Sequence, residues 1–222
     1  MHDKSAGGGE TAAPHTQGKV IHWARFYDLV TALMSFGQSG RVRKATVDLA
    51  GIGAGERVLD VGCGTGTLTL MAGTRAGPSG EVHGIDASPE MIEVASGKAA
   101  KKRVEVGFQV ALIEQLPFPD GHFDVVLSSL MLHHLPDDLK RKGFQEVRRV
   151  LKPGGRLLAI DLGARGGSLL SRLMGLVPGH GLPRDYIERL QTMAREAGFE
   201  GVESGPVGMG PLAYVRATKG EE

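Results

Sequence analysis

Residues 58–66 read VLDVGCGTG, and this stretch decides the fold of the chain. An apolar strand carries an acidic residue near its end, and three alternating glycines then form a turn that opens a helix at Thr67. Glycine lets the backbone bend sharply and leaves no Cβ between the main chain and a ligand. The start of a helix also presents N–H groups that have no partner inside the helix. The pattern predicts a nucleotide-type site at the carboxyl end of a parallel strand.

The acidic residue of this stretch, Asp60, bears on which nucleotide fits. The dinucleotide fingerprint is Gly-x-Gly-x-x-Gly with pyrophosphate at the helix start, but here the third glycine comes one residue early and Thr67 takes its place. Two like charges about 4 Å apart repel by roughly 1 kcal/mol in water, and by more in a partly buried site. S-adenosyl-L-methionine has no phosphate and carries an ammonium and a sulfonium, so Asp60 favours this cofactor. A phosphate-bearing dinucleotide and a turn without a ligand are the alternatives.

From residue 58 onward, short apolar runs alternate with amphipathic stretches, which is typical of βα units around a parallel sheet. Ser88 followed by Pro89 is a strong helix start, because serine caps the helix and proline suits its first position. We expect strands at 57–61, 81–85, 104–110, 123–128, 156–161, 199–204 and 212–218. We expect helices at 20–34, 41–50, 66–75, 136–150 and 183–197, and one that follows Ser88.

Three further segments follow the glycine turn in a recognisable order. They read VHGIDAS at 82–88, LPFPDGHFDVV at 116–126 and RVLKPGGRL at 149–157. Together with 58–66 they resemble the class I S-adenosylmethionine-dependent methyltransferases, closest to the quinone-biosynthesis C-methyltransferases and related small-molecule enzymes, over residues 20–218. The resemblance implies an α/β fold: a Rossmann-like, seven-stranded, mostly parallel sheet with helices on both faces and a C-terminal antiparallel hairpin strand.

The domain organisation follows from composition. Residues 1–18 are rich in glycine and polar residues and are expected to be a disordered leader. The resemblance implies that residues 19–222 form one methyltransferase domain, in which 19–52 are expected to supply helices over the cofactor. Residues 163–182 read as a lid-like apolar insertion above the carboxyl edge of the sheet, with a short helix packed into the core as the alternative.

Several cofactor contacts are expected on the strand ends. Asp86 lies 20 residues after Gly66 and is suited to accept hydrogen bonds from ribose hydroxyls. Met91, one turn into the next helix, would cover an adenine face or else belong to the core. The amine of the methionine moiety would be held by Asp60 and the backbone around Gly62 and Gly64. The expected cofactor set is completed by Ser128 near the methionine moiety, Cys63 within the glycine turn and Ala87 next to Asp86. Tyr27 also belongs to this set, because its segment resembles the one that folds over the cofactor in the family; an aromatic helix face packed on the core is the alternative.

One departure from the resembled pattern concerns the adenine amine. Many relatives carry Asp-Ala four residues before the Leu-Pro-Phe segment, where this chain has Leu112 and Ile113. The backbone N–H of Ile113 can still meet the ring, but the side-chain hydrogen bond, worth about 1 kcal/mol, is lost.

Methyl transfer needs a general base only where the acceptor must lose a proton. His133, just after the fourth strand, matches the position where some related O-methyltransferases carry their base, and we name it as the catalytic candidate. A purely structural histidine is the alternative, and His22 is a weaker candidate. His133 and His134 have no further clustered ligand in the sequence, so no metal site is expected.

The bulk properties exclude several classes. A net charge of +1 implies no general polyanion affinity, hence no nucleic-acid partner. Basic clusters at 41–44, 98–103 and 140–149 read as solvated helix faces, with peripheral contact to an anionic membrane as the alternative. Cys63 is the single cysteine, so it forms no disulfide framework; a reactive thiol is less expected there than a small lining residue. The absence of a signal peptide or an 18-residue apolar run favours the cytoplasm. A homodimer is left open.

The sequence therefore predicts an enzyme that transfers methyl from S-adenosyl-L-methionine to a small, largely apolar acceptor, aromatic or quinone-like. N-methylation of an amine or lipid headgroup is one alternative, and a catalytically silent cofactor-binding subunit is another. A short-chain nicotinamide oxidoreductase is disfavoured, because Thr31, Leu190 and Thr218 stand four residues after the three tyrosines, where such an enzyme needs lysine.

Overall fold

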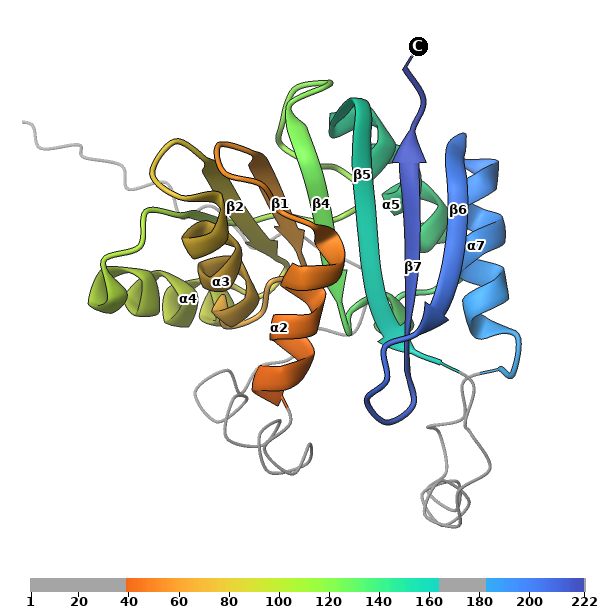
Figure 1. Ribbon diagram of the computed structural model, residues 1–222, viewed down its shortest axis with the longest axis horizontal. Coiled ribbons are helices and arrows are strands. Elements are labelled where there is room, and N and C mark those ends of the chain that lie inside the picture. Colours follow the sequence, from red (N-terminus) through yellow and green to blue (C-terminus); the bar gives the residue numbers. More distant parts are fainter. Residues whose placement is uncertain (1–38, 164–182, 222) are drawn as a thin grey trace, which may run out of the picture.

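A seven-stranded sheet with the order β3-β2-β1-β4-β5-β7-β6 organises the computed structural model, which describes residues 39–163 and 183–221 (Figure 1). All neighbours pair in parallel except β5 with β7 and β6 with β7, which pair antiparallel. The strands are β1 Arg57–Val61, β2 Glu81–Asp86, β3 Gly107–Val110, β4 Phe123–Ser129, β5 Leu151–Leu162, β6 Phe199–Pro206 and β7 Leu212–Lys219. The α/β fold with a mostly parallel sheet and an antiparallel hairpin is therefore confirmed.

Helices cover both faces of this sheet. They are α2 Ser39–Ala50, α3 Thr67–Ala76, α4 Pro89–Lys102, α5 Asp137–Val150 and α7 Tyr186–Glu196, with a short 3-10 helix η1 at Leu132–His134. In Figure 1, α2, α3 and α4 lie on the near face, and α5 and α7 lie on the far face. The carboxyl ends of β1, β2, β4 and β5 meet at one edge, as parallel pairing requires. This edge positions the site.

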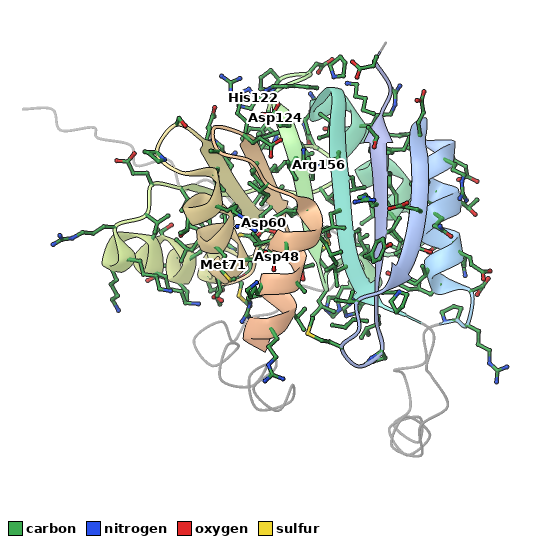
Figure 2. The ribbon with its side chains drawn as sticks, viewed as in Figure 1. Asp48, Asp60, Met71, His122, Asp124 and Arg156 are labelled. Atoms are coloured by element: carbon green, nitrogen blue, oxygen red, sulfur yellow. The ribbon has the colours of Figure 1, made fainter. Side chains whose placement is uncertain are left out.

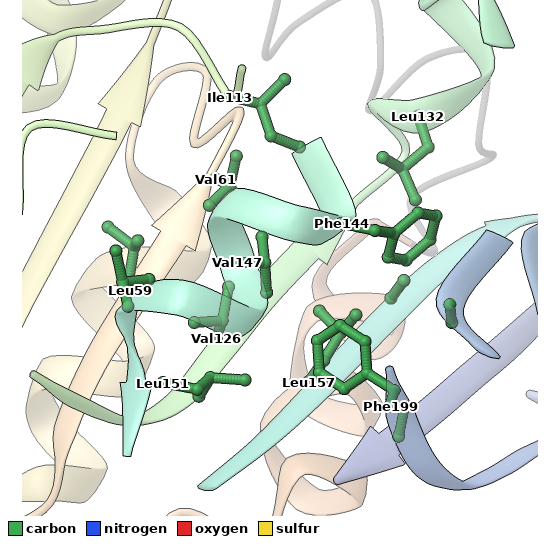
Figure 3. Packing of buried hydrophobic residues seen from close by; sticks show 14 of the residues in the cluster. Leu59, Val61, Ile113, Val126, Leu132, Phe144, Val147, Leu151, Leu157 and Phe199 are labelled. Atoms are coloured by element: carbon green, nitrogen blue, oxygen red, sulfur yellow. The ribbon is translucent and has the colours of Figure 1, made fainter. Parts of the chain in front are cut away.

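Two apolar layers hold the sheet between the helices. Strands buried on both faces must be apolar on both faces, and Val58 and Leu59 are fully buried on opposite sides of β1. Phe144 and Val147 lie three residues apart on α5 and therefore share one face of that helix. Figure 3 shows these two side chains packed toward Val61 and Leu157 of the sheet.

An arginine ties the helix α2 to the sheet. The guanidinium of Arg156 on β5 donates to both carboxylate oxygens of Glu56, at 2.9 and 2.8 Å. It also donates to the carbonyls of Ala50 and Gly51, at 2.7 and 2.8 Å, where α2 ends. Figure 2 shows Arg156 toward the end of the sheet where β1 and β4 begin.

Most expected elements form where the sequence placed them, and the differences have local causes. The first strand matches residue for residue, and Ser88 caps α4 by accepting a hydrogen bond from the Met91 N–H at 3.3 Å. β3 begins at Gly107 rather than 104, because pairing with β2 starts only at His83. β5 begins at Leu151 rather than 156, because Leu151 already pairs with Phe123 before the register shifts.

Some expectations fall outside the described residues. These are the leader at 1–18, the helix at 20–34 and all of the lid-like insertion at 163–182 except Gly163. Within 39–163 and 183–221, no helix is long and apolar enough to cross a membrane.

Candidate active site

The glycine turn lies at the carboxyl end of β1, where its three glycines adopt a left-handed backbone. Gly62, Gly64 and Gly66 have φ angles of +72°, +53° and +73°. A Cβ on Gly62 would overlap the Met131 side chain, and one on Gly66 would lie 2.6 Å from the Phe108 ring. Two of the three glycines are therefore required by the protein's own packing as well as by the turn, whereas the sequence suggested access for a ligand.

The N–H groups of the turn are already engaged within the protein. Gly62 and Cys63 both donate to the carbonyl of Ile85 at 2.9 Å, and Gly66 donates to the carbonyl of Cys63 at 3.0 Å. Gly64 donates to the Asp86 carboxylate at 2.9 Å. A phosphate-binding loop offers such groups to the ligand, so this turn is poorly equipped for a diphosphate.

The Asp60 carboxylate binds the first turn of α3. Its side chain is 1% exposed. Its carboxylate accepts from the hydroxyl of Thr69 at 2.7 Å and from the Thr69 backbone N–H. A negative charge is favourable at a helix N-terminus, yet burial raises the pKa of Asp60 to about 7, helped by the nearby charge of Asp86. The charge of Arg43 on α2 offsets this pKa rise only in part.

Asp86 closes the turn from the end of β2. Its second oxygen accepts from the Ser88 N–H at 3.0 Å, and Ala87 lies half-buried between the two. Burial raises the pKa of Asp86, and the hydrogen bonds from Ser88 and Gly64 only partly oppose this rise. Two carboxylates that burial desolvates, those of Asp60 and Asp86, thus lie beside one turn. These acceptors fit S-adenosyl-L-methionine, which carries a positive ammonium and sulfonium, and do not fit the phosphates of a dinucleotide.

Three other expected cofactor residues belong to the interior. Met91 is 2% exposed, which agrees with the alternative that it belongs to the core. Ile113 is 7% exposed and packs where a Cβ on Gly143 of α5 would stand, while Leu112 is half-buried. Burial raises the pKa of the Cys63 thiol well above its usual range, so the thiol stays protonated and is a weak nucleophile. Contacts of these residues with the cofactor stay predictions.

Ser128 faces the core below the site. Its hydroxyl is buried, and no described residue lies within hydrogen-bond distance of it. It borders a small cavity whose other walls are apolar and come from Val61, Ile113, Leu132, Phe144, Val147 and Leu157. This orientation gives no support to the predicted contact with the methionine moiety, which stays a prediction.

His133 is held by a buried carboxylate at the end of the neighbouring strand. Its ring Nδ1 lies 2.6 Å from Oδ1 of Asp161, and its backbone N–H donates to Oδ2 of the same residue at 3.0 Å. The hydroxyl of Tyr186 on α7 also donates to Oδ2, at 3.1 Å. The His134 ring stacks at a tilt on His133, with centroids 3.9 Å apart. The catalytic candidate therefore has an oriented ring.

Asp161 and Tyr186 are site residues that the sequence reasoning missed. Asp161 is the second-last residue of β5, as Asp60 is of β1, and Asp86 is the last residue of β2, so the same signal could have found Asp161. Tyr186 gives no such signal, because its contact depends on how α7 packs. The expected site residues Tyr27 and His22 lie outside the described residues. Among residues 39–163 and 183–221, no three metal-binding side chains lie together.

Comparison with known proteins gives a consistent result. A family model described as "Methyltransferase domain" matches residues 58–155. The ubiquinone/menaquinone biosynthesis C-methyltransferase of Pseudomonas paraeruginosa is 36% identical over 217 residues, covering 87% of this chain and 84% of that protein. The demethylmenaquinone methyltransferase of Thermus thermophilus is 44% identical over 135 residues, covering 61% of this chain and 60% of that protein.

Solved structures share the fold at lower identity. A SAM-dependent methyltransferase from Aquifex aeolicus superposes with a TM-score of 0.66 at 23% identity, covering 88% of this chain and 96% of that one. The [4+2]-cyclase SpnF reaches a TM-score of 0.70 at 22% identity, covering 90% and 96%. The same architecture thus supports methyl transfer and a different chemistry.

Proposed function

The chain belongs to the ubiquinone/menaquinone biosynthesis C-methyltransferase family of class I S-adenosylmethionine-dependent methyltransferases, and on this premise we propose that it methylates a ring carbon of a quinone-like acceptor. The identity of 36% over 87% of the chain is the observation that carries the proposal. The acidic glycine turn independently supports the cofactor, because the buried carboxylate of Asp60 and the half-buried one of Asp86 favour a cationic ligand.

The residues of the chain divide the work of such a transfer. When bound, S-adenosyl-L-methionine supplies an electrophilic methyl group on a sulfonium. Asp86 would accept from the ribose hydroxyls, and Asp60 with the glycine turn would hold the amino-acid end. The protein otherwise aligns the acceptor carbon and excludes water. His133 takes the proton that the acceptor must lose, with its Nδ1 held by Asp161.

The acceptor is expected in its reduced, hydroxyl-bearing form. A sulfonium methyl is attacked by an electron-rich carbon, and ring hydroxyls enrich the carbons next to them, whereas the carbonyls of an oxidised quinone withdraw electrons. A base that takes a hydroxyl proton further activates the ring.

The test incubates the purified protein with S-adenosyl-L-methionine and a short-chain demethylated naphthoquinol kept reduced by dithionite. We expect S-adenosylhomocysteine to form together with a product that has gained one methyl group, as measured by mass spectrometry. The oxidised quinone serves as the matched control and should give no turnover above background. Turnover with phosphoethanolamine but not with the quinol would instead favour N-methylation of a headgroup. Binding of S-adenosylhomocysteine without any turnover would favour a silent cofactor-binding subunit.

We also propose a location in the cytoplasm with contact to an anionic membrane surface, where an apolar quinol would be reached. Lys101, Lys102 and Arg103 are exposed at the end of α4 and support this contact. Cell fractionation tests the compartment. Sedimentation with phosphatidylglycerol vesicles, compared with phosphatidylcholine vesicles, tests the surface, and equal recovery with both would contradict it.

A further inference from the structure

We propose that Asp161 and Tyr186 are positioning residues that fix the tautomer and orientation of His133, so that Nε2 is the nitrogen that takes a proton. The catalytic use of this arrangement rests on the proposed function, whereas the tautomer itself does not. The three residues come from η1, the end of β5 and the start of α7, so the fold assembles them from separate elements.

The carboxylate of Asp161 is built to hold the histidine. It is 1% exposed and accepts four hydrogen bonds. Oδ1 takes the His133 ring at 2.6 Å and the Leu162 N–H at 2.8 Å, and Oδ2 takes the His133 N–H at 3.0 Å and the Tyr186 hydroxyl at 3.1 Å. An ionised carboxylate has about four acceptor positions and no donor. Backbone and ring of His133 are thus bound to one group, which leaves the ring little freedom to turn.

This pairing decides which ring nitrogen carries the hydrogen. Because an ionised carboxylate can only accept, Nδ1 must be the donor and a neutral His133 must leave Nε2 with its lone pair. The same logic underlies the triads in which a buried aspartate holds a histidine in its basic tautomer. The His133 side chain is 18% exposed, so a proton taken by Nε2 can pass to water.

Tyr186 fixes the aspartate from the other side. It is 4% exposed, and burial, followed by the charge of Asp161, raises the pKa of its hydroxyl, so it remains a donor. The Lys140 ammonium lies 5.0 Å from the centre of the Tyr186 ring and 3.0 Å from an oxygen of Asp137. Arg189 of α7 also binds Asp137. The titratable groups around Tyr186 and His133 are therefore Asp161, which binds both, His134, which contacts His133, and the charged group of Lys140, Asp137 and Arg189.

In the proposed methyl transfer, His133 and Asp161 account for the proton that the acceptor loses. The acceptor carbon forms a bond to the methyl carbon, and the bond from methyl carbon to sulfur breaks with its electron pair remaining on sulfur. The acceptor's hydroxyl or ring proton forms an N–H bond with Nε2 of His133. The resulting imidazolium keeps its Nδ1–H on the Asp161 carboxylate, which stabilises the positive charge.

The first test needs no acceptor. Nitrogen-15 NMR of the histidine rings, with S-adenosylhomocysteine bound, reports which nitrogen of His133 is protonated, and H133Q assigns the signal. We expect Nδ1–H in the wild type. In D161N the amide can donate to Nδ1, so we expect a shift toward Nε2–H. An Nε2–H signal in the wild type, or an unchanged signal in D161N, would overturn the proposal.

The second test uses turnover of the quinol. We expect D161N to lower kcat by about 100-fold, the low end for loss of a positioned base, with acceptor KM and S-adenosylhomocysteine affinity within a few-fold. Y186F should lower kcat by about 5-fold, the equivalent of one hydrogen bond.

The control and the outcomes separate this proposal from the proposed function. D124N removes a carboxylate that also accepts two hydrogen bonds, from Arg57 and Lys152, but at the amino end of β4 (Figure 2), and it should leave kcat unchanged. Unchanged kcat in D161N would refute positioning even if the wild type turns over. A wild type that turns over no quinol refutes the proposed function, and the tautomer measurement then still decides the arrangement. If D161N does not fold, the proposal is tested by the kcat of Y186F and by the nitrogen-15 signal of His133 in the wild type.

Discussion

At the scale of single residues, two effects act in opposite directions on the charge of Asp60. Burial in the fold favours its neutral form, whereas a bound ammonium favours its ionised form. Its carboxylate binds Thr69 at the start of α3 but is almost fully desolvated, so its pKa rises from 3.8 to about 7. The folded protein therefore holds a proton on Asp60 that the unfolded chain releases. Such a group stabilises the fold fully below pH 3.8, and its contribution is lost as the pH rises through about 7.

We predict that D60N stabilises the protein above pH 7. The neutral amide can still accept from Thr69 without the desolvation of a charge, and each pKa unit corresponds to about 1.4 kcal/mol, so the rise from 3.8 to about 7 sets an upper limit of about 4 kcal/mol for the gain at pH 8. Urea unfolding at pH 8 and pH 5 measures it, and the gain should shrink at pH 5. D48N alters an exposed aspartate on α2 (Figure 2), whose pKa is lowered by a hydrogen bond from Lys44, and should bring no gain. A loss of stability in D60N at pH 8 would contradict the prediction.

The same carboxylate should make cofactor binding depend on pH. The ammonium of the ligand's amino-acid end favours ionised Asp60, so the protein must lose a proton to bind it when the pH is below about 7. We expect the affinity for S-adenosylhomocysteine, measured by calorimetry, to be several-fold weaker at pH 6 than at pH 8. In D60N the affinity should be lower at pH 8 and nearly flat over this range. An equal pH dependence in both proteins would show that Asp60 does not sense the ligand.

At the scale of elements, the glycine turn is locked by the segment that follows β4. Met131 fills the space beside Gly62, and Phe108 of β3 fills the space beside Gly66. The turn is thus held from two sides before any ligand arrives.

We predict that G62A destabilises the protein by about 3 kcal/mol, the sum of a left-handed backbone and overpacking against Met131. G121A is the matched control, because Gly121 has a φ of +60° but open space beside it; it should lose only about 1 kcal/mol. Adding M131A to G62A should recover part of the loss. Equal losses in G62A and G121A would contradict the role of Met131. Denaturant unfolding measures all four proteins.

A small cavity beside Ser128 lies between the sheet and α5 and leads to a second prediction at this scale. The cavity beside Ser128 holds about 10 Å³, at the lower limit for one water, and offers that water a single polar partner. We therefore expect a dry cavity and an unpaired hydroxyl. S128A should stabilise the protein by about 1 kcal/mol, whereas S129A, the next residue along β4, should change stability by less than about 0.5 kcal/mol. A clear loss in S128A would indicate an ordered water in the cavity.

The elements also show what the sequence could predict. Strand ends and helix caps depend on neighbouring residues, so β1 and the start of α4 were predicted to the residue. β3 and β5 differ from expectation because their bounds depend on pairing with β2 and β4. In the site, Asp60 and Asp86 were found from the local pattern of an acid at a strand end, whereas Asp161 has the same pattern and was missed. The contact of Tyr186 with Asp161 spans elements that only tertiary packing brings together.

At the scale of the whole molecule, β7 joins the edge strand β6 to the parallel part of the sheet. It pairs with β5 from Arg156 to Leu162 on one side and with β6 on the other. α7, which carries Tyr186, packs against β6 and β7. The geometry around Asp161 therefore depends on a strand that itself contributes no residue to the site.

We predict that a chain ending after Pro206 shows no cooperative unfolding transition, because β6 then has no sheet partner and β5 has an open edge. A chain ending after Lys219 keeps all of β7 and should keep the transition. Thermal unfolding followed by circular dichroism compares the two. A sharp transition in the shorter chain would contradict the central place of β7.

The position of β7 affects how the sheet forms during synthesis on the ribosome. A ribosome releases β6 and α7 before the strand that must slide between β6 and β5, so the nascent chain carries two unsatisfied strand edges while residues 212–219 are still inside the exit tunnel. Native closure of the sheet, and with it the hold of Asp161 on His133, therefore waits until β7 has been synthesised and has left the tunnel. Until then the exposed edges are open to chaperones and to pairing with other nascent chains.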